Sequence, residues 1–297
     1  MFRHILVPLD GSKLAEAVMP DAHALAQRLG ARVTLLHIVE QHAPATVHGD
    51  THLSGRSEAE KYLSTLAQRW SRDGVDVQAH VHTEQPQNVA KMIVDQAAEL
   101  GADLIVLSTH GHSGLREKLL GSIAQQVVHE GRVPVLLIRP EREGVERPRT
   151  IQSILLPLDG ERVHESAIPV AVELAAKLGA NIHLLSVVPT VETLSGDETA
   201  PSAVLPNAMR AVLDFAQQGG ADYLRRVRAD IMSATTAEVA RGDPARSIVS
   251  AAKRVNADLI VMATHGRMGL SAFWSASVAP KVLNDFDGPL LLLRAER

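Results

Sequence analysis

The sequence predicts an α/β protein of two tandem domains, each built on a doubly wound sheet of five parallel strands flanked by helices. Two observations lead to this prediction. The chain of 297 residues contains itself twice, because ILVPLDG at 5–11 returns as ILLPLDG at 154–160, and ADLIVLSTHG at 102–111 returns as ADLIVMATHG at 257–266. Within each copy, short apolar runs alternate with amphipathic stretches of helical spacing, which is the order of strands and helices in a parallel sheet.

The elements of the first copy follow from this alternation. Gly30 is expected to end the first helix as its C-cap. The third strand alternates apolar and polar residues, so we expect it at an edge of the sheet. The pattern predicts strands at 5–9, 33–39, 75–82, 104–107 and 133–138, and helices at 12–29, 56–72, 88–100 and 122–130.

The last strand of each copy is apolar throughout, reading VPVLLI at 133–138 and GPLLLL at 288–293. An uncovered edge of this kind would promote aggregation. We therefore predict that the two last strands pair with each other across a pseudo-two-fold axis, which makes the chain an intramolecular pseudo-dimer. The alternative is that helices bury each strand within its own domain, and a further homodimer stays open.

Domain boundaries and composition narrow the class of protein. The charged, proline-flanked segment at 140–150 reads as a linker, so the domains are expected at 1–140 and 150–297. The net charge is −4, aromatic residues make up 3%, and no cysteine is present. These values argue against nucleic acid as a partner and exclude thiolate chemistry. Because no apolar run reaches the ~18 residues of a membrane span, no membrane partner is expected and the cytoplasm is the expected compartment.

Two segments stand where ligands bind in open parallel sheets, at the carboxyl ends of strands. The first is Pro8-Leu9-Asp10-Gly11, and the second runs from Ser108 through His110 and Gly111 to Gly121-Ser122. Asp10 could cap the following helix, or it could accept a hydrogen bond from a ribose hydroxyl or hold a metal ion together with the phosphates. His110 could bond loop backbone or act as an acid or base.

The start of the helix at 122 has a clear electrostatic interpretation. Free N–H groups and the positive end of the helix dipole attract anions, and the glycine before Ser122 allows close approach of a phosphate. The alternative is that Gly121 makes a plain tight turn and Ser122 is an N-cap. No Walker loop, nucleophile elbow or HExxH motif is present. We therefore predict no catalytic residue and no protein metal site.

Taken together, ILVPLDGS, LLHI at 35–38, ADLIVLSTHG and the G-x9-G-S of 111–122 resemble the universal stress protein family, in a tandem form. The resemblance implies two Rossmann-like domains and a nucleotide fingerprint, G-x2-G-x9-G-[ST]. The first copy reads Ser108-x2-Gly111-x9-Gly121-Ser122, with serine for the first glycine. The second copy reads Ala263-x2-Gly266-x9-Ala276-Ser277, with alanine for the first and third glycines.

The resemblance also implies a ligand, ATP, with Mg²⁺ or Mn²⁺, and assigns residues to it. In the first copy, Pro8, Asp10, Ile38 and Leu107 would lie at the adenosine half, while Ser108, Gly111, Gly121 and Ser122 would hold the phosphates. We add Leu9 and His110 to this predicted site. The matching positions of the second copy are Asp159, Val187, Met262, Ala263, Gly266, Ala276 and Ser277.

The departures from the fingerprint predict unequal copies. Ala276 places a methyl group where a phosphate would approach, and it would add about 1 kcal/mol of strain if the position needs a positive φ. We therefore expect the first copy to bind nucleotide and the second to bind it weakly or not at all. The predicted function is a nucleotide-binding regulator of the stress response with little or slow hydrolysis. The alternatives are a nucleotide-free scaffold and a low-turnover ATP hydrolase that uses His110 or His112.

Overall fold

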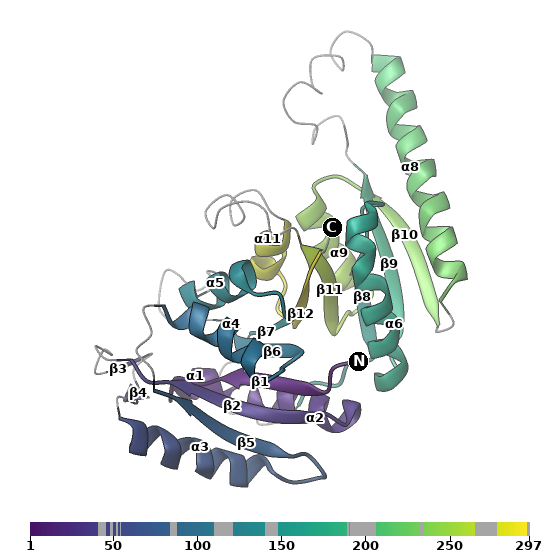
Figure 1. The fold of residues 1–297 in the computed structure, drawn as a ribbon. Coiled ribbons are helices and arrows are strands. Elements are labelled where there is room, and N and C mark those ends of the chain that lie inside the picture. Colours follow the sequence, from purple (N-terminus) through teal and green to yellow (C-terminus); the bar gives the residue numbers. More distant parts are fainter. Residues whose placement is uncertain are drawn as a thin grey trace. The chain divides into compact units, whose positions relative to one another are not determined.

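The computed structural model describes residues 1–40, 46–47, 50–51, 53, 55–83, 88–109, 121–139, 148–188, 190, 206–231, 234–264 and 278–295. These residues fall into two compact units, and in each of them strands and helices alternate along the chain (Figure 1). Among the described residues, the first unit contains residues up to Thr150 and Pro289–Arg294. The second contains Ile151–Thr264, residues 278–288 and Ala295.

The first unit is a six-stranded sheet in the order β12-β7-β6-β1-β2-β5. The five strands of the first repeat run parallel, with β5 at the edge, as the sequence predicts. A separate pair, β3 and β4, was not predicted. The bounds are β1 His4–Pro8, α1 Lys13–Glu16, α2 Met19–Leu29, β2 Arg32–Ile38, β3 Thr46–Val47, β4 Asp50–Thr51, α3 Arg56–Trp70, β5 Val77–His82, α4 Val89–Glu99, β6 Leu104–Ser108, α5 Ser122–Glu130, β7 Val135–Ile138 and β12 Leu290–Arg294.

The sixth strand of this sheet comes from the end of the second repeat. β12 pairs antiparallel with β7, and Leu290 lies opposite Leu137 and Leu292 opposite Val135. The guanidinium of Arg294 extends the contact by donating to the backbone carbonyl of Gly131 at 2.9 Å. The predicted pairing of the two last strands is therefore confirmed, and β7 is not left as an apolar edge.

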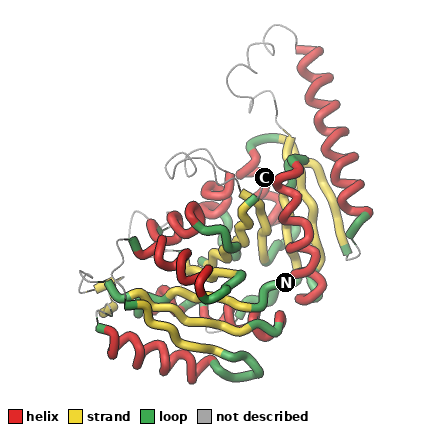
Figure 2. The backbone as a smooth tube through the Cα atoms, viewed as in Figure 1, coloured by secondary structure: helices red, strands yellow, loops and turns green. Residues whose placement is uncertain are grey.

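The strand order places a topological switch point between β1 and β6. From β1 the chain moves through β2 to β5 on one side, whereas β6 and β7 lie on the other side. Because crossovers between parallel strands are right-handed, this reversal puts α2 and α3 on one face of the sheet and α4 and α5 on the other (Figure 2). In open parallel sheets, such a switch point forms a crevice at the carboxyl ends of the strands, and ligands bind there.

The stretch predicted as one helix at 12–29 is two helices. α1 is capped by Ser12, and α2 begins at Met19 with Pro20 in its first turn, where the missing N–H of proline costs nothing. Gly30 ends α2 in the left-handed conformation with φ of 67°, as predicted. The second repeat is interrupted at the equivalent place, before Pro169. The proline therefore sets the break in both copies.

The second unit repeats the arrangement with four parallel strands in the order β10-β9-β8-β11. Its long helix has 24 residues, against 15 for its counterpart α3. No helix in the described part of the chain has both the length and the apolar character needed to cross a bilayer. The bounds are β8 Ser153–Pro157, the 3-10 helix η2 Arg162–Ser166, α6 Ala167–Leu178, β9 Asn181–Val188, α8 Pro206–Ala229, β10 Thr235–Arg241, α9 Pro244–Arg254, β11 Leu259–Thr264 and α11 Val278–Asp285.

The aspartate of each ADLIV motif has a structural role. The carboxylate of Asp103 accepts hydrogen bonds from the backbone N–H groups of Arg3 and His4 at 2.8 to 3.0 Å. Asp258 accepts the matching bonds from Gln152 and Ser153. In both repeats this side chain holds the first strand beside the strand that begins within the motif, and so it aligns two strands whose carboxyl ends flank the switch point.

Candidate functional site

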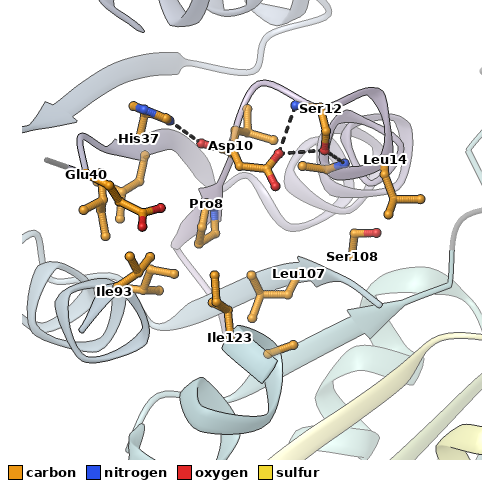
Figure 3. Close-up of a pocket in the computed structure, with 16 residues that line it drawn as sticks. Pro8, Asp10, Ser12, Leu14, His37, Glu40, Ile93, Leu107, Ser108 and Ile123 are labelled. Carbon is orange, nitrogen blue, oxygen red and sulfur yellow. Dashed lines mark hydrogen bonds between the residues drawn. The ribbon is translucent and has the colours of Figure 1, made fainter. Parts of the chain in front are cut away.

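A pocket lies at the carboxyl edge of the first unit's sheet, where β1, β2 and β6 end (Figure 3). Its cavity volume is about 90 Å³. The lining is mostly apolar, with a few polar groups, which is typical of small-molecule sites.

Three separate segments of the predicted site meet in this pocket. They come from the end of β1, the end of β2 and the end of β6, so residues about 100 positions apart line one cavity. The predicted residues that line it are Pro8, Leu9, Asp10, Ile38, Leu107 and Ser108. His110 and Gly111 lie outside the described residues. Gly121 and Ser122 directly precede Ile123 and Ala124, two further lining residues on α5.

Asp10 is held by one of its two carboxylate oxygens. Oδ1 accepts hydrogen bonds from the backbone N–H of Ser12 at 2.9 Å and from its hydroxyl at 2.7 Å. Ser12 Oγ in turn accepts from the N–H of Ala15 and caps α1, so Ser12, not Asp10, is the helix cap. Within the described residues, Oδ2 of Asp10 has no hydrogen-bond partner. The turn therefore orients a carboxylate whose second oxygen can accept from a ligand.

The start of α5 corrects two sequence interpretations. Gly121 has φ of −58° and ψ of 147°, a conformation open to any L-residue. The strain argument made for Ala276 from a required positive φ is therefore wrong for the position that Gly121 represents. Gly121 is the cap residue and Ser122 the first residue of the nine-residue helix, so Ser122 is not an N-cap. The first N–H groups of this helix have no intrahelical acceptor and carry positive partial charge.

His37 connects the end of β1 to a segment near the pocket, a role that the sequence did not reveal. Its side chain is buried, with Nδ1 2.7 Å from the carbonyl oxygen of Leu9 and Nε2 3.2 Å from that of Leu53. Leu53 packs so closely on Gly11 that a Cβ there would lie 2.8 Å from Leu53 Cγ. Since Gly11 also has φ of 89°, only glycine suits this turn.

Most residues that form the walls of the pocket were not predicted from the sequence. Val89 and Ile93 are four residues apart on α4 and share a helix face, a spacing that could have indicated a common surface. Glu40 follows Ile38 by two residues, and Ile123 follows Gly121 by two residues. The lining residues that were not predicted are Ser12, Leu14, Ala15, Leu36, His37, Glu40, Val89, Ile93, Ile123 and Ala124.

The matching aspartate of the second repeat is bonded differently. Asp159 Oδ1 accepts from the backbone N–H of Glu161 at 2.9 Å, and Oδ2 lies 2.5 Å from Nδ1 of His164. At the offset of 149, His164 takes the place of Ala15. Both carboxylate oxygens of Asp159 are therefore engaged by the chain itself.

A buried phenol belongs to the same region of the second unit. Burial raises the pKa of Tyr223, and the carboxylates of Glu165 and Asp159 raise it further, so the phenol stays protonated. Of the other residues predicted for this repeat, some are described by the structure and some are not. Val187 lies near the end of β9, and Met262 and Ala263 lie near the end of β11. Gly266, Ala276 and Ser277 fall outside the described residues.

The chain matches the model described as the universal stress protein family over residues 1–139 and again over residues 150–294. It belongs to the universal stress protein family. A universal stress protein of Mycolicibacterium smegmatis is 27% identical over 306 residues, covering 98% of this chain and 96% of that protein. A shorter family member from Methanocaldococcus jannaschii is 29% identical over 153 residues, covering 48% of this chain and 86% of its own length.

Solved structures of the family show the same fold. The crystal structure of a universal stress protein from Archaeoglobus fulgidus covers 98% of this chain and 96% of its own, with a TM-score of 0.70 at 17% identity. Another solved universal stress protein is in complex with cAMP. It covers 50% of this chain and all of its own length, with a TM-score of 0.35 and 18% identity.

Proposed function

We propose that the pocket of the first repeat binds an adenine nucleotide, ATP with Mg²⁺ or Mn²⁺, and that the protein acts as a nucleotide-responsive regulator of the stress response in the cytoplasm. The convergence of six predicted residues on one pocket at the switch point of the sheet carries this proposal. Ligands of open parallel sheets bind at such points.

The chemistry of the lining suits the three parts of a nucleotide. Apolar side chains of Ile38, Ile93 and Leu107 offer walls for a base. Oδ2 of Asp10, which has no partner within the described residues, offers an acceptor for a ribose hydroxyl. The start of α5, which lies beside the pocket at Ile123, offers N–H groups and positive dipole charge to phosphates.

The proposal also includes unequal repeats. The carboxylate of Asp159 already has a partner on each oxygen, so a ligand hydroxyl would have to displace His164. Isothermal titration of the full chain with Mg-ATP should therefore give one site per chain. Two equal sites would contradict the inequality, and absence of binding would contradict the proposed function in favour of a nucleotide-free scaffold.

Slow chemistry is the remaining part of the proposal. The described lining contains no lysine or arginine that could neutralise a leaving phosphate. Phosphate release should therefore stay near background in the purified protein under saturating Mg-ATP. Robust turnover that is lost in His110→Ala would favour an ATP hydrolase instead.

A further inference from the structure

We infer that Glu40 determines which base the pocket accepts, by offering a carboxylate to the exocyclic amino group of a 6-aminopurine. This inference rests on the proposed function and adds a base-reading side chain to it. Glu40 lines the pocket just beyond the end of β2, and its local sequence does not mark it as a site residue.

The order of the strands places Glu40 at the base end of the pocket. At the carboxyl edge, β6, β1 and β2 follow one another, so Ser108, Asp10 and Glu40 come in that order across the crevice. Ile123, in the first turn of α5, lies beside Leu107 of β6 in Figure 3, so the anion-attracting start of this helix is near the end of β6. In Figure 3, Glu40 lies beside Ile93 and is separated from Asp10 by Pro8. A nucleotide with its phosphates toward α5 and its ribose at Asp10 therefore directs its base to Glu40.

Apolar side chains line the pocket together with Glu40 and suit the flat faces of a base. Ile38, Val89 and Ile93 are among them, Figure 3 shows Ile93 beside Glu40, and Glu40 itself is half-buried. A hydrogen bond to a carboxylate gains strength where water is partly excluded. The carboxylate accepts hydrogen bonds only, so it distinguishes a donor on the base from an acceptor.

The charge of the lining supports the same orientation. Of the described residues that line the pocket, Asp10 and Glu40 are the two carboxylates, and none is a lysine or arginine. Two carboxylates attract the amino and hydroxyl donors of a nucleoside and repel phosphate oxygens. Phosphates are thereby kept away from the β1–β2 side. In the second repeat the position equivalent to Glu40 is Pro189 by sequence, which has no side-chain acceptor.

The test compares ATP with ITP, in which a carbonyl oxygen replaces the amino group of the base. The full chain should bind Mg-ATP at least about tenfold more tightly than Mg-ITP, because the carboxylate bonds the amino group and repels the carbonyl. In Glu40→Gln the side-chain amide accepts from adenine or, turned over, donates to hypoxanthine. The ratio of the two dissociation constants should then fall to within about threefold, chiefly through tighter binding of ITP.

A matched variant controls for the loss of charge. Glu58 is exposed in the first turn of α3 and does not line the pocket, so Glu58→Gln should keep the wild-type ratio. Thermal unfolding of each variant establishes that it is folded. Equal binding of ATP and ITP by the wild type, or an unchanged ratio in Glu40→Gln, would overturn the role of Glu40 and leave the proposed function standing. Failure of the wild type to bind either nucleotide would overturn both.

Discussion

The turns after the first strand of the two repeats share the letters Asp-Gly but differ in what the aspartate does. In the first repeat, Oδ1 of Asp10 accepts hydrogen bonds from Ser12, Oδ2 has no partner within the described residues, and the side chain lines the pocket. In the second, Oδ1 of Asp159 accepts from the backbone N–H of Glu161, and Oδ2 lies within hydrogen-bond distance of His164. The glycines of both turns adopt nearly the same positive φ, 89° and 83°.

A repeated backbone turn therefore does not imply a repeated site. The glycine preserves the path of the chain, whereas the residue five positions after the aspartate decides whether the carboxylate is available. That residue is Ala15 in one repeat and His164 in the other. A single side chain can therefore decide whether the second carboxylate oxygen of this aspartate has a partner in the chain.

The largest expected effect is a difference in Mg-ATP affinity between substitutions of Asp10 and of Asp159. Asp10→Asn keeps the amide oxygen for Ser12 and removes the charged acceptor, so affinity for Mg-ATP should fall about 10- to 100-fold, the value of a hydrogen bond to a charged group. Asp159→Asn should change it less than about twofold. Isothermal titration of both variants measures the difference. Equal losses would contradict the assignment of the site to the first repeat.

Gly121→Val tests the phosphate end of the pocket. Because Gly121 has φ of −58°, valine should not strain the backbone there, but its side chain should obstruct a phosphate. Affinity for Mg-ATP should fall at least about tenfold while the protein stays folded, which a cooperative thermal transition establishes. Ala276→Val, the equivalent change in the second repeat, should leave affinity unaltered. Retained affinity in Gly121→Val would remove α5 from the site.

The two helix starts after the first strands should differ in stability. Ser12→Ala removes the cap of α1 and should cost about 1 kcal/mol, seen as a fall of about 2–4 °C in the melting temperature of the first unit. Glu161 makes no side-chain cap of η2, and Glu161→Ala keeps the N–H that bonds Asp159. Its effect should stay within about 0.5 kcal/mol. Scanning calorimetry would refute the contrast if the two shifts were equal.

The smallest effect concerns pH. Burial lowers the pKa of His4 below the ordinary 6.5, and the charge of Arg32 lowers it further. The unfolded chain therefore binds more protons than the folded one as pH falls below about 6.5, and stability decreases there. His4→Gln should reduce the slope of unfolding free energy between pH 7 and pH 5.

The position equivalent to His4 in the second repeat is Ser153, which does not titrate in this range. The slope should not vanish in His4→Gln, because burial also lowers the pKa of His183 in the second unit. Urea unfolding at a series of pH values measures the slope. A slope identical to that of the wild type would show that His4 takes up its proton equally in both states.

Much of the fold could be predicted because its signals are local or repeated. Buried parallel strands read as unbroken apolar runs, and Gly30 marks the end of α2 by its left-handed conformation. The pairing of β7 with β12 followed from the problem of an apolar edge. The break between α1 and α2 was missed because the apolar periodicity continues across it, although Pro20 marked the place.

The site could be predicted at the strand ends and much less well at its walls. Pro8, Asp10 and Ser108 stand where the topology brings ligands, so their position in the chain was informative. Ile93 lies on α4, and Glu40 follows the end of β2. The sequence around each residue is equally consistent with a role in packing alone. Nothing in their immediate neighbours indicates that they share a cavity.

By itself the sequence determined the two repeats, the alternation of strands and helices that makes the sheet parallel, and the glycine turns. These features depend on apolar periodicity and on the backbone freedom of glycine. The tertiary structure alone decided that both oxygens of Asp159 have partners in the chain while Oδ2 of Asp10 has none within the described residues, and that Glu40 lines the same pocket as Asp10. The physical reason is that the residues that meet at the pocket are far apart along the chain. Right-handed crossovers carry residues from β1, β2, α4 and β6 to one edge of the sheet, where hydrogen-bond partners are set by spatial neighbours.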